Sequence, residues 1–208
     1  MDAPEFFRTM TPNQPPVRDS IFAALNVAAG IVLIYVVARP GHVESPLLAG
    51  WLGMIGIVMV LHFGIFKGLA LFWNAAGVPA TPIMDAPVCS WSLSEFWGRR
   101  WNTGFSIPAR RYLMEPVARR FGTVMGVLTV FVVSGLVHEL VISLPAKAGY
   151  GLPTLYFLIQ AAGLIAERKL GPNRFWMVVC VAAPAFILFH SSFVYRVIIP
   201  FLKAIGAL

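Results

Sequence analysis

Charged side chains are scarce in this sequence. They make up 12% of its 208 residues, whereas 58% of the residues are apolar and the mean hydropathy is +0.77. An average soluble domain is about 25% charged and about 45–50% apolar. A soluble fold with so few charges could not cover its surface with polar groups. The composition therefore excludes an ordinary cytosolic domain, and its high apolar content excludes a disordered chain.

Cysteine is also rare, and no metal-binding pattern is present. Cys89 and Cys180 could form at most one disulfide, and their spacing does not suit a metal. The four histidines form no HxxxH or HxxE pattern on one helix face. We therefore expect neither a disulfide scaffold nor a metal site. Residues 1–20 are polar and interrupted by prolines, which predicts an extended or interfacial leader rather than a signal peptide.

Long apolar runs dominate what is present. A helix needs about 20 apolar residues to cross the hydrocarbon core of a membrane. Five runs approach that length, at residues 21–38, 47–66, 123–143, 151–166 and 174–195, the last with a kink expected at Pro184. They predict an all-α transmembrane bundle of five spans, or six if residues 69–80 also dip into the membrane. Residues 21–208 are expected to form a single membrane domain.

The basic residues indicate an orientation. The net charge is +7, and placing the amino terminus in the cytoplasm puts 12 of the 16 Lys and Arg side chains on the cytoplasmic side. Cytoplasmic loops of membrane proteins carry such an excess. No basic motif or base-stacking platform accompanies the charge, so we do not expect nucleic acid as a partner.

An unusual polar segment lies between the second and third runs. Residues 92–102 read Ser-Leu-Ser-Glu-Phe-Trp-Gly-Arg-Arg-Trp-Asn. Interleaved aromatic and basic residues are typical of a segment in the membrane interface. Ser94 could cap a short helix here. The paired Arg99 and Arg100 could bind phosphate, which leaves a phosphorylated substrate and phospholipid head groups as alternatives.

A second polar feature lies inside the third run, where His138 and Glu139 interrupt an apolar helix. Ionisable residues within a span are costly and are functional candidates by default. On a helix, Ser134 lies one turn before His138, and its small side chain leaves room for a substrate. A neutral imidazole can act as a general base. The alternative is a histidine that hydrogen-bonds a neighbouring helix.

Together, residues 92–102 and the sequence Phe-Val-Val-Ser-Gly-Leu-Val-His-Glu at 131–139 resemble the membrane-bound O-acyltransferase superfamily. The motif Phe-Trp-Gly-Arg-Arg-Trp-Asn resembles that of the wax synthase branch, the long-chain-alcohol O-fatty-acyltransferases. The resemblance is close over residues 84–143. Family members are usually longer, so the chain could be a compact form, a fragment or half of an assembly.

The resemblance implies a chemistry and a set of site residues. It implies transfer of a fatty acyl group from acyl-coenzyme A to a lipophilic alcohol inside the membrane, with acyl-coenzyme A as a co-substrate and no further cofactor. His138 and Asn102 match the family's catalytic histidine and its second signature residue. The expected substrate-binding residues are Arg99, Arg100, Trp97, Trp101, Glu139 and Ser134.

This assignment makes a geometric prediction. His138 lies about 15 residues into its span, which is roughly 22 Å from the cytoplasmic end. Asn102 belongs to a segment that hydropathy places at the surface. Two residues that share one reaction must lie close together. We therefore predict that residues 91–105 dip inward, that Trp97 and Trp101 pack on bundle helices, and that Asn102 shares a cavity with His138.

Several points stay open at the level of sequence. The acceptor could be a fatty alcohol, a sterol or a secondary metabolite, and a non-catalytic lipid-binding or transport protein is the alternative from another class. Arg outnumbers Lys by 12 to 4, and alanine is abundant. This composition favours a bacterial cytoplasmic membrane over the endoplasmic reticulum. Membrane lipids are expected partners, and a monomer and a homo-oligomer are both left open by the sequence.

Overall fold

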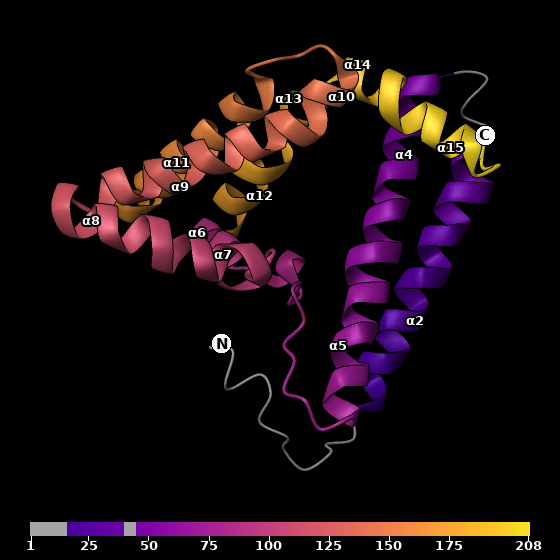
Figure 1. Cartoon of the computed structure of the whole chain (residues 1–208), viewed down its shortest axis with the longest axis horizontal. Helices are drawn as coiled ribbons and strands as arrows, with labels where there is room; N and C mark the ends of the chain where they lie inside the picture. Colours follow the sequence, from indigo (N-terminus) through magenta and orange to yellow (C-terminus); the bar gives the residue numbers. More distant parts are fainter. Residues whose placement is uncertain (1–15, 40–44) are drawn as a thin grey trace. The chain divides into compact units, whose positions relative to one another are not determined.

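The computed structural model of the protein describes residues 16–39 and 45–208 (Figure 1). It divides into two compact units, Met1–Met84 with Leu202–Leu208, and Asp85–Phe201. Throughout the described part of the chain, the regular structure is helical, which confirms the predicted all-α class. Residues 1–15 of the predicted leader lie outside the described residues.

The first unit contains two long antiparallel helices. Their segments are α2 (Val17–Val32) with the π-helical turn η1 (Leu33–Val37), and α4 (Pro46–Val58) with the π-helical segment η2 (Met59–Ile65) and α5 (Phe66–Ala75). The two helices cross where Gly30 meets Gly56. A Cβ atom on Gly30 would lie 2.6 Å from the carbonyl oxygen of Gly56, so only glycine permits this approach. At the amino-terminal end of α2, the Asp19 carboxylate lies 2.8 Å from the Nζ atom of Lys67 in α5.

The second unit begins with short helical pieces and continues with longer helices. The pieces are η3 (Pro87–Cys89), α6 (Leu93–Glu95), η4 (Phe96–Arg100), α7 (Thr103–Ala109), η5 (Arg110–Met114) and α8 (Glu115–Phe121). The later elements are α9 (Thr123–His138), η6 (Glu139–Ser143), α10 (Leu144–Ala146), α11 (Leu152–Leu170), α12 (Arg174–Ala182), α13 (Ala185–Leu188), α14 (Ser191–Phe193) and η7 (Val194–Ile198). Helix α15 (Ile199–Ala204) begins in this unit, and its residues from Leu202 onward belong to the first unit.

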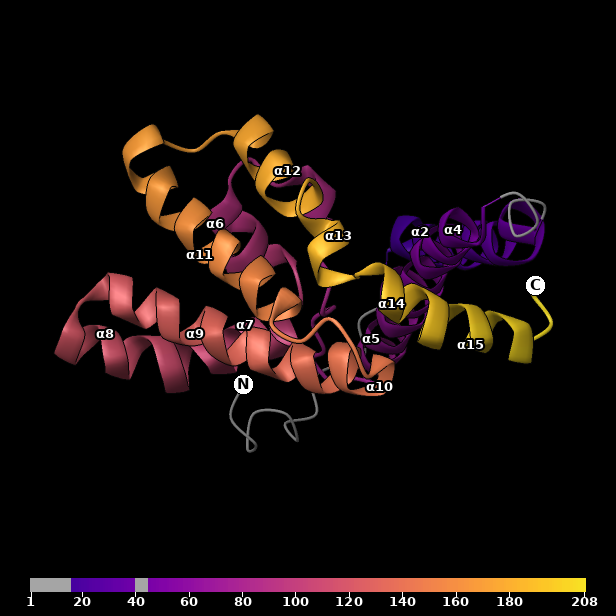
Figure 2. The same ribbon diagram turned by 90° about the horizontal axis from the view of Figure 1, so that it is seen from above.

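Helix α11 is central to the second unit. It packs against α9, α13, α12 and the short helix α6 (Figure 2). The contact with α9 is closest at Gly135, where a Cβ atom would lie 2.7 Å from the Cα atom of Thr154. Glycine at this position therefore brings the helix that carries His138 directly against α11.

The predicted number of spans is too high. Three helices of the described chain are long and apolar enough to cross a membrane, Val17–Val37, Pro46–Ala75 and Thr123–Ala146. The expected sixth span at 69–80 is mostly the end of the second of these helices. Helix α11 fails as a span because its last turn contains Glu167, Arg168 and Lys169. Its apolar part is too short, at about 24 Å, for a hydrocarbon core of about 30 Å.

The fifth predicted run is a broken element. Arg174–Leu188 and Ser191–Ala204 meet at an angle of 57° and count as a fourth span only if taken together. Pro184 interrupts the first part as predicted, since α12 ends at Ala182 and α13 begins at Ala185. The sharper bend lies at His190, whose Nδ1 atom accepts a hydrogen bond from the Phe193 amide at 3.2 Å.

Candidate active site

The polar segment 92–102 starts with a capped helical turn. The hydroxyl of Ser92 accepts a hydrogen bond from the Glu95 amide at 3.0 Å, so Ser92 caps α6, and the expectation of a Ser94 cap is wrong. The chain then forms the π-helical turn η4, in which the Trp101 amide donates to the carbonyl oxygen of Phe96 at 2.8 Å. Asn102 follows in the left-handed region, with φ at +46°, and starts α7. Asparagine tolerates this conformation better than most residues.

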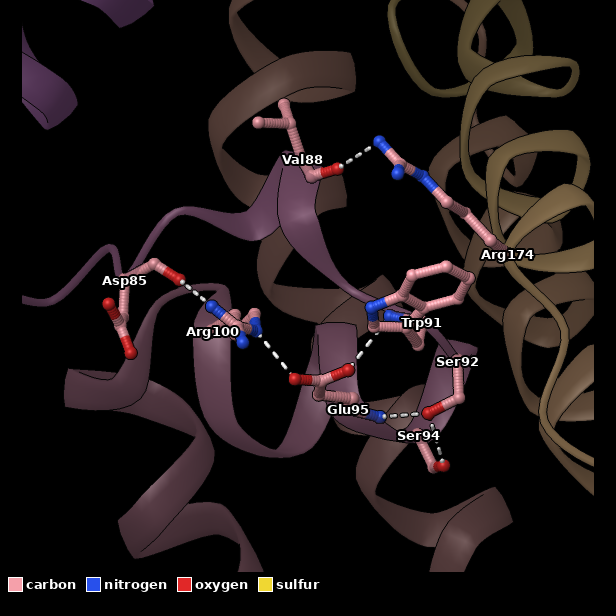
Figure 3. Close-up of polar contacts among 8 residues, drawn as sticks. All are labelled: Asp85, Val88, Trp91, Ser92, Ser94, Glu95, Arg100 and Arg174. Carbon is pink, nitrogen blue, oxygen red and sulfur yellow. Dashed lines mark hydrogen bonds and ion pairs between the residues drawn. The ribbon is translucent and has the colours of Figure 1, made fainter.

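A small polar network fixes the outer side of this segment (Figure 3). The carboxylate of Glu95 accepts from the Trp91 amide at 2.8 Å and from Arg100 Nε at 2.7 Å. Arg100 also donates to the carbonyl oxygen of Asp85 at 3.2 Å. The hydrogen bonds from the Trp91 amide and Arg100 hold the pKa of the Glu95 carboxyl below its ordinary value, and Glu95 in turn raises the pKa of Arg100. Arg174 donates to the Val88 carbonyl oxygen at 3.3 Å.

The inner side of the segment is packed into the unit, as predicted. Leu93 is fully buried and Phe96 nearly so, in a cluster with Met177 and Cys180 of α12. The Trp97 ring lies 5.7 Å from Phe131 of α9 and 5.8 Å from Phe157 of α11. Trp101 stacks on Phe96 at 5.4 Å. Trp97 therefore contacts two bundle helices and Leu93 and Phe96 are buried, whereas other residues of the segment are exposed: Ser94, Gly98, Arg99 and Asn102.

His138 is half-buried at the end of α9, and its orientation is defined. Its Nδ1 atom lies 2.7 Å from the carbonyl oxygen of Ser134. A carbonyl oxygen can only accept, so Nδ1 carries the hydrogen and Nε2 of the neutral ring has a lone pair. The imidazole also packs on Phe157, with ring centroids 4.5 Å apart. The free nitrogen is thus available to accept a proton from a substrate.

His138 and Asn102 line the same cavity. Its volume is about 680 Å³, which is within the range of small-molecule sites. Aromatic and aliphatic side chains form most of its wall, and a few polar groups converge on it. The lining includes Ser94, Trp97, Gly98, Trp101, Asn102, Ser106, Arg110, Phe131, Ser134, His138, Phe157, Leu164, Glu167 and Arg168. The predicted common cavity is therefore present, although hydropathy alone would place the two residues at different depths in the membrane.

Other sequence-predicted residues lie elsewhere. Arg99 and Arg100 are not among the residues that line the cavity, and Arg100 is bound to Glu95. Two different arginines, Arg110 and Arg168, line it instead. Glu139 is also absent from the lining. Its Oε1 atom accepts hydrogen bonds from Gly151 and Thr154 at the start of α11.

Ser134 lines the cavity, but its hydroxyl is directed to its own helix. It donates to the carbonyl oxygen of Val130 at 2.9 Å. The small side chain leaves space beside the imidazole, as the spacing predicts, and its hydroxyl is engaged in α9. In the described part of the chain, no group of three His, Cys, Asp or Glu side chains is arranged to hold a metal ion.

Two polar residues of α11 are not among the site residues predicted from the sequence. Glu167 is 5% exposed and accepts hydrogen bonds from the amides of Leu93 and Ser94 at 2.6 and 2.9 Å. Gln160 is fully buried and accepts from Trp97 Nε1 at 3.2 Å. Because Glu167 precedes two basic residues, the sequence favours its interpretation as the charged end of a span. The signal for a site residue is that its carboxylate continues the helical stripe that contains Phe157.

Comparison with known proteins agrees with the sequence resemblance. Residues 80–159 match the Membrane bound O-acyl transferase family. The chain is 28% identical over 168 residues to “Probable long-chain-alcohol O-fatty-acyltransferase 3” of Arabidopsis thaliana. It is 39% identical over 117 residues to “Probable long-chain-alcohol O-fatty-acyltransferase 9” of the same plant. It is 33% identical over 100 residues to “Long-chain-alcohol O-fatty-acyltransferase” of Simmondsia chinensis. The predicted resemblance is confirmed.

The matches cover only part of each protein. The three alignments span 74%, 50% and 41% of this chain and 49%, 34% and 28% of the respective relatives. The chain thus spans about half the length, or less, of these curated relatives. No solved structure matches the chain.

Proposed function

We propose, from the match of residues 80–159 to the membrane bound O-acyl transferase family, that this membrane protein transfers a fatty acyl group from acyl-coenzyme A to the hydroxyl of a lipophilic alcohol. The observation that carries the proposal is that His138 and Asn102 line the same cavity. The two residues are 36 positions apart in the sequence, and hydropathy assigns them to different depths.

The geometry supports His138 as the general base. Its Nε2 lone pair accepts the proton of the alcohol hydroxyl as the hydroxyl oxygen attacks the thioester carbonyl. A new oxygen–carbon bond forms, the carbon–sulfur bond breaks, and the proton passes from Nε2 to the departing coenzyme A sulfur. The products are an ester and free coenzyme A. The Asn102 side chain orients the substrates or donates a hydrogen bond to the oxyanion.

The aromatic wall suits the acyl chain, and the arginines suit the donor's phosphates. Arg110 and Arg168 line the cavity and can bind phosphate bidentately. The sequence assigns the same role to Arg99 and Arg100, so the two pairs are competing proposals. We favour Arg110 and Arg168, because they line the cavity and Arg99 and Arg100 do not.

The acceptor is proposed to be a long-chain alcohol, because the relatives named above are long-chain-alcohol O-fatty-acyltransferases. A sterol or a secondary-metabolite hydroxyl is the alternative acceptor for the same chemistry. We place the protein in a bacterial cytoplasmic membrane on the excess of Arg over Lys.

The test is lipid analysis of cells that express the chain. Cells are supplied with a labelled fatty acid, as the source of labelled acyl-coenzyme A, and with a panel of fatty alcohols and sterols. We expect labelled esters of one alcohol class, and none from cells that express the His138→Ala variant. Labelled lipid that accumulates without ester, and equally with His138→Ala, would favour a lipid-binding or transport protein instead.

A further inference from the structure

Helix α11 is bound through carboxylates at both of its ends. At its start, Glu139 Oε1 accepts hydrogen bonds from the Gly151 amide at 3.0 Å, the Thr154 amide at 3.1 Å and the Thr154 hydroxyl at 2.9 Å. The first amides of a helix have no partner within the helix, and a carboxylate there is favoured by the helix dipole. Glu139 directly follows His138, so this contact ties the end of α9 to α11.

At the other end of α11, Glu167 binds the segment that leads to Asn102. Its two carboxylate oxygens accept from the Leu93 amide at 2.6 Å and the Ser94 amide at 2.9 Å. The residue is 5% exposed. A buried carboxylate is costly unless it is paired, so these two hydrogen bonds are strongly favoured over any alternative in which the segment moves away.

Between its two ends, α11 contacts both halves of the site. The Phe157 ring lies 4.5 Å from the His138 ring and 5.8 Å from the Trp97 ring. Gln160 accepts from Trp97 Nε1 at 3.2 Å and donates to the Cys180 carbonyl oxygen at 2.6 Å. These residues share one helical face with Glu167, at spacings of three and seven. The face is continuous from His138 to the start of the polar segment.

We propose that Glu139 and Glu167 are positioning residues that set the location of His138 relative to Asn102 through α11. The proposal rests on the proposed acyl transfer for its catalytic consequence, but the positioning itself is a property of the fold. Neither carboxylate takes or gives a proton in the reaction. Each acts through backbone amides, one beside the general base and the other at the start of the segment that ends in Asn102.

The physical reason for carboxylates at both positions is the strength of charge-assisted hydrogen bonds, with Glu167 buried and Glu139 half-buried. Such bonds are shorter and stronger than neutral ones. A residue such as serine could cap one amide, whereas each of these carboxylates binds at least two donors. Small displacements of reacting groups, of the order of 1 Å, can reduce turnover about 100-fold, so the site benefits from rigid placement.

The experiment uses the full chain in detergent and the variants Glu167→Ala, Glu167→Gln, Glu139→Gln and, as a control, Asp19→Asn. Asp19 also forms a charge-assisted bond, to Lys67, but belongs to the other unit. Hydrogen–deuterium exchange is followed by mass spectrometry. We expect exchange of the Leu93 and Ser94 amides to be about tenfold faster or more in both Glu167 variants. Glu139→Gln should have the same effect at Gly151 and Thr154, and Asp19→Asn should change neither region.

Steady-state kinetics separates positioning from other roles. Positioning predicts at least a tenfold lower kcat per folded molecule for Glu167→Gln and Glu139→Gln, with the KM for acyl-coenzyme A within about twofold of wild type. An unchanged kcat, or a raised KM with unchanged kcat, would overturn the proposal. Unchanged exchange would overturn it independently of activity. A wild-type chain without ester synthesis would instead contradict the proposed function, and the exchange data would still decide the positioning.

Discussion

The Nδ1 atom of His138 lies 2.7 Å from the carbonyl oxygen of Ser134, one turn earlier in the same helix. This backbone contact fixes the tautomer, because the carbonyl oxygen needs a donor. It also leaves Nε2 as the acceptor in a cavity that Asn102 shares. The backbone of α9 therefore sets the tautomer of the imidazole, and Phe157 of α11 packs on its ring.

The crossing of α9 and α11 at Gly135 should be intolerant of any side chain. Gly135→Ala would put a Cβ atom 2.7 Å from the Cα atom of Thr154. We expect a loss of about 1–3 kcal/mol of stability from this overpacking, seen as a lower thermal midpoint in detergent. Gly68→Ala is the matched control, since no heavy atom lies within 4 Å of its Cβ position. Equal midpoints for the two variants would contradict the close crossing.

The Glu95–Arg100 pair should make stability depend on acid pH. The Trp91 amide and Arg100 lower the pKa of the Glu95 carboxyl in the folded state, so its contribution is complete above the unfolded value of about 4.3. It is lost as the pH falls through the lowered folded value. We expect the gap in thermal midpoint between wild type and Glu95→Gln to be constant from about pH 8 to 5 and to close on further acidification. A gap that widens in acid would have the wrong sign.

The donor's phosphates should be bound by the arginines that line the cavity. Changing Arg110 and Arg168 together to Gln should raise the KM for acyl-coenzyme A about tenfold or more, because each bidentate contact to phosphate is charge-assisted. Arg99→Gln should leave this KM unchanged, since Arg99 does not line the cavity. The reverse pattern, measured by donor titration in membrane or detergent preparations, would favour Arg99 and Arg100 as the phosphate-binding residues.

The orientation can be tested at the two ends of one helix. Thr123–Ala146 has 24 residues, and so spans about 36 Å. In a Cys89→Ser background, Arg119→Cys before this helix should react with an impermeant maleimide only after the cells are opened. Lys147→Cys after it should react in intact cells. Labelling of position 119 from outside would reverse the predicted topology.

The sequence predicts the all-α class and a cavity lined by both His138 and Asn102, but not the polar contacts that hold the second unit together. The apolar third run, its His138 and the inward packing of Trp97 follow from hydropathy, from the cost of buried polar groups and from the distance limit of a shared reaction. Glu167 could not be predicted in the same way. Its partners Leu93 and Ser94 lie more than 70 residues earlier, and no periodicity relates them.

The pairing of Arg100 with Glu95 could not be predicted from the sequence for a different reason. Glu95 and Arg100 are five residues apart, which is not a neighbouring pair on an α-helix. In the structure the chain between them is π-helical, with a hydrogen bond from Trp101 to Phe96 that spans five residues. This turn aligns residues five apart, so the arginine binds a glutamate rather than facing the cavity. The predicted span count is too high for another reason: the apolar run of α11 is visibly short and ends at Glu167, Arg168 and Lys169, and the prediction nevertheless counts it as a span.

An ester-synthesis assay tests whether His138 is the base of an acyl transfer. Purified full-length chain is incubated with labelled acyl-coenzyme A and a long-chain alcohol, and ester is quantified for wild type and His138→Ala. We expect ester synthesis by wild type and a loss of at least about 100-fold in His138→Ala, with the thermal midpoint of the variant close to that of wild type. Ester synthesis by a folded His138→Ala variant at near wild-type rates would contradict it.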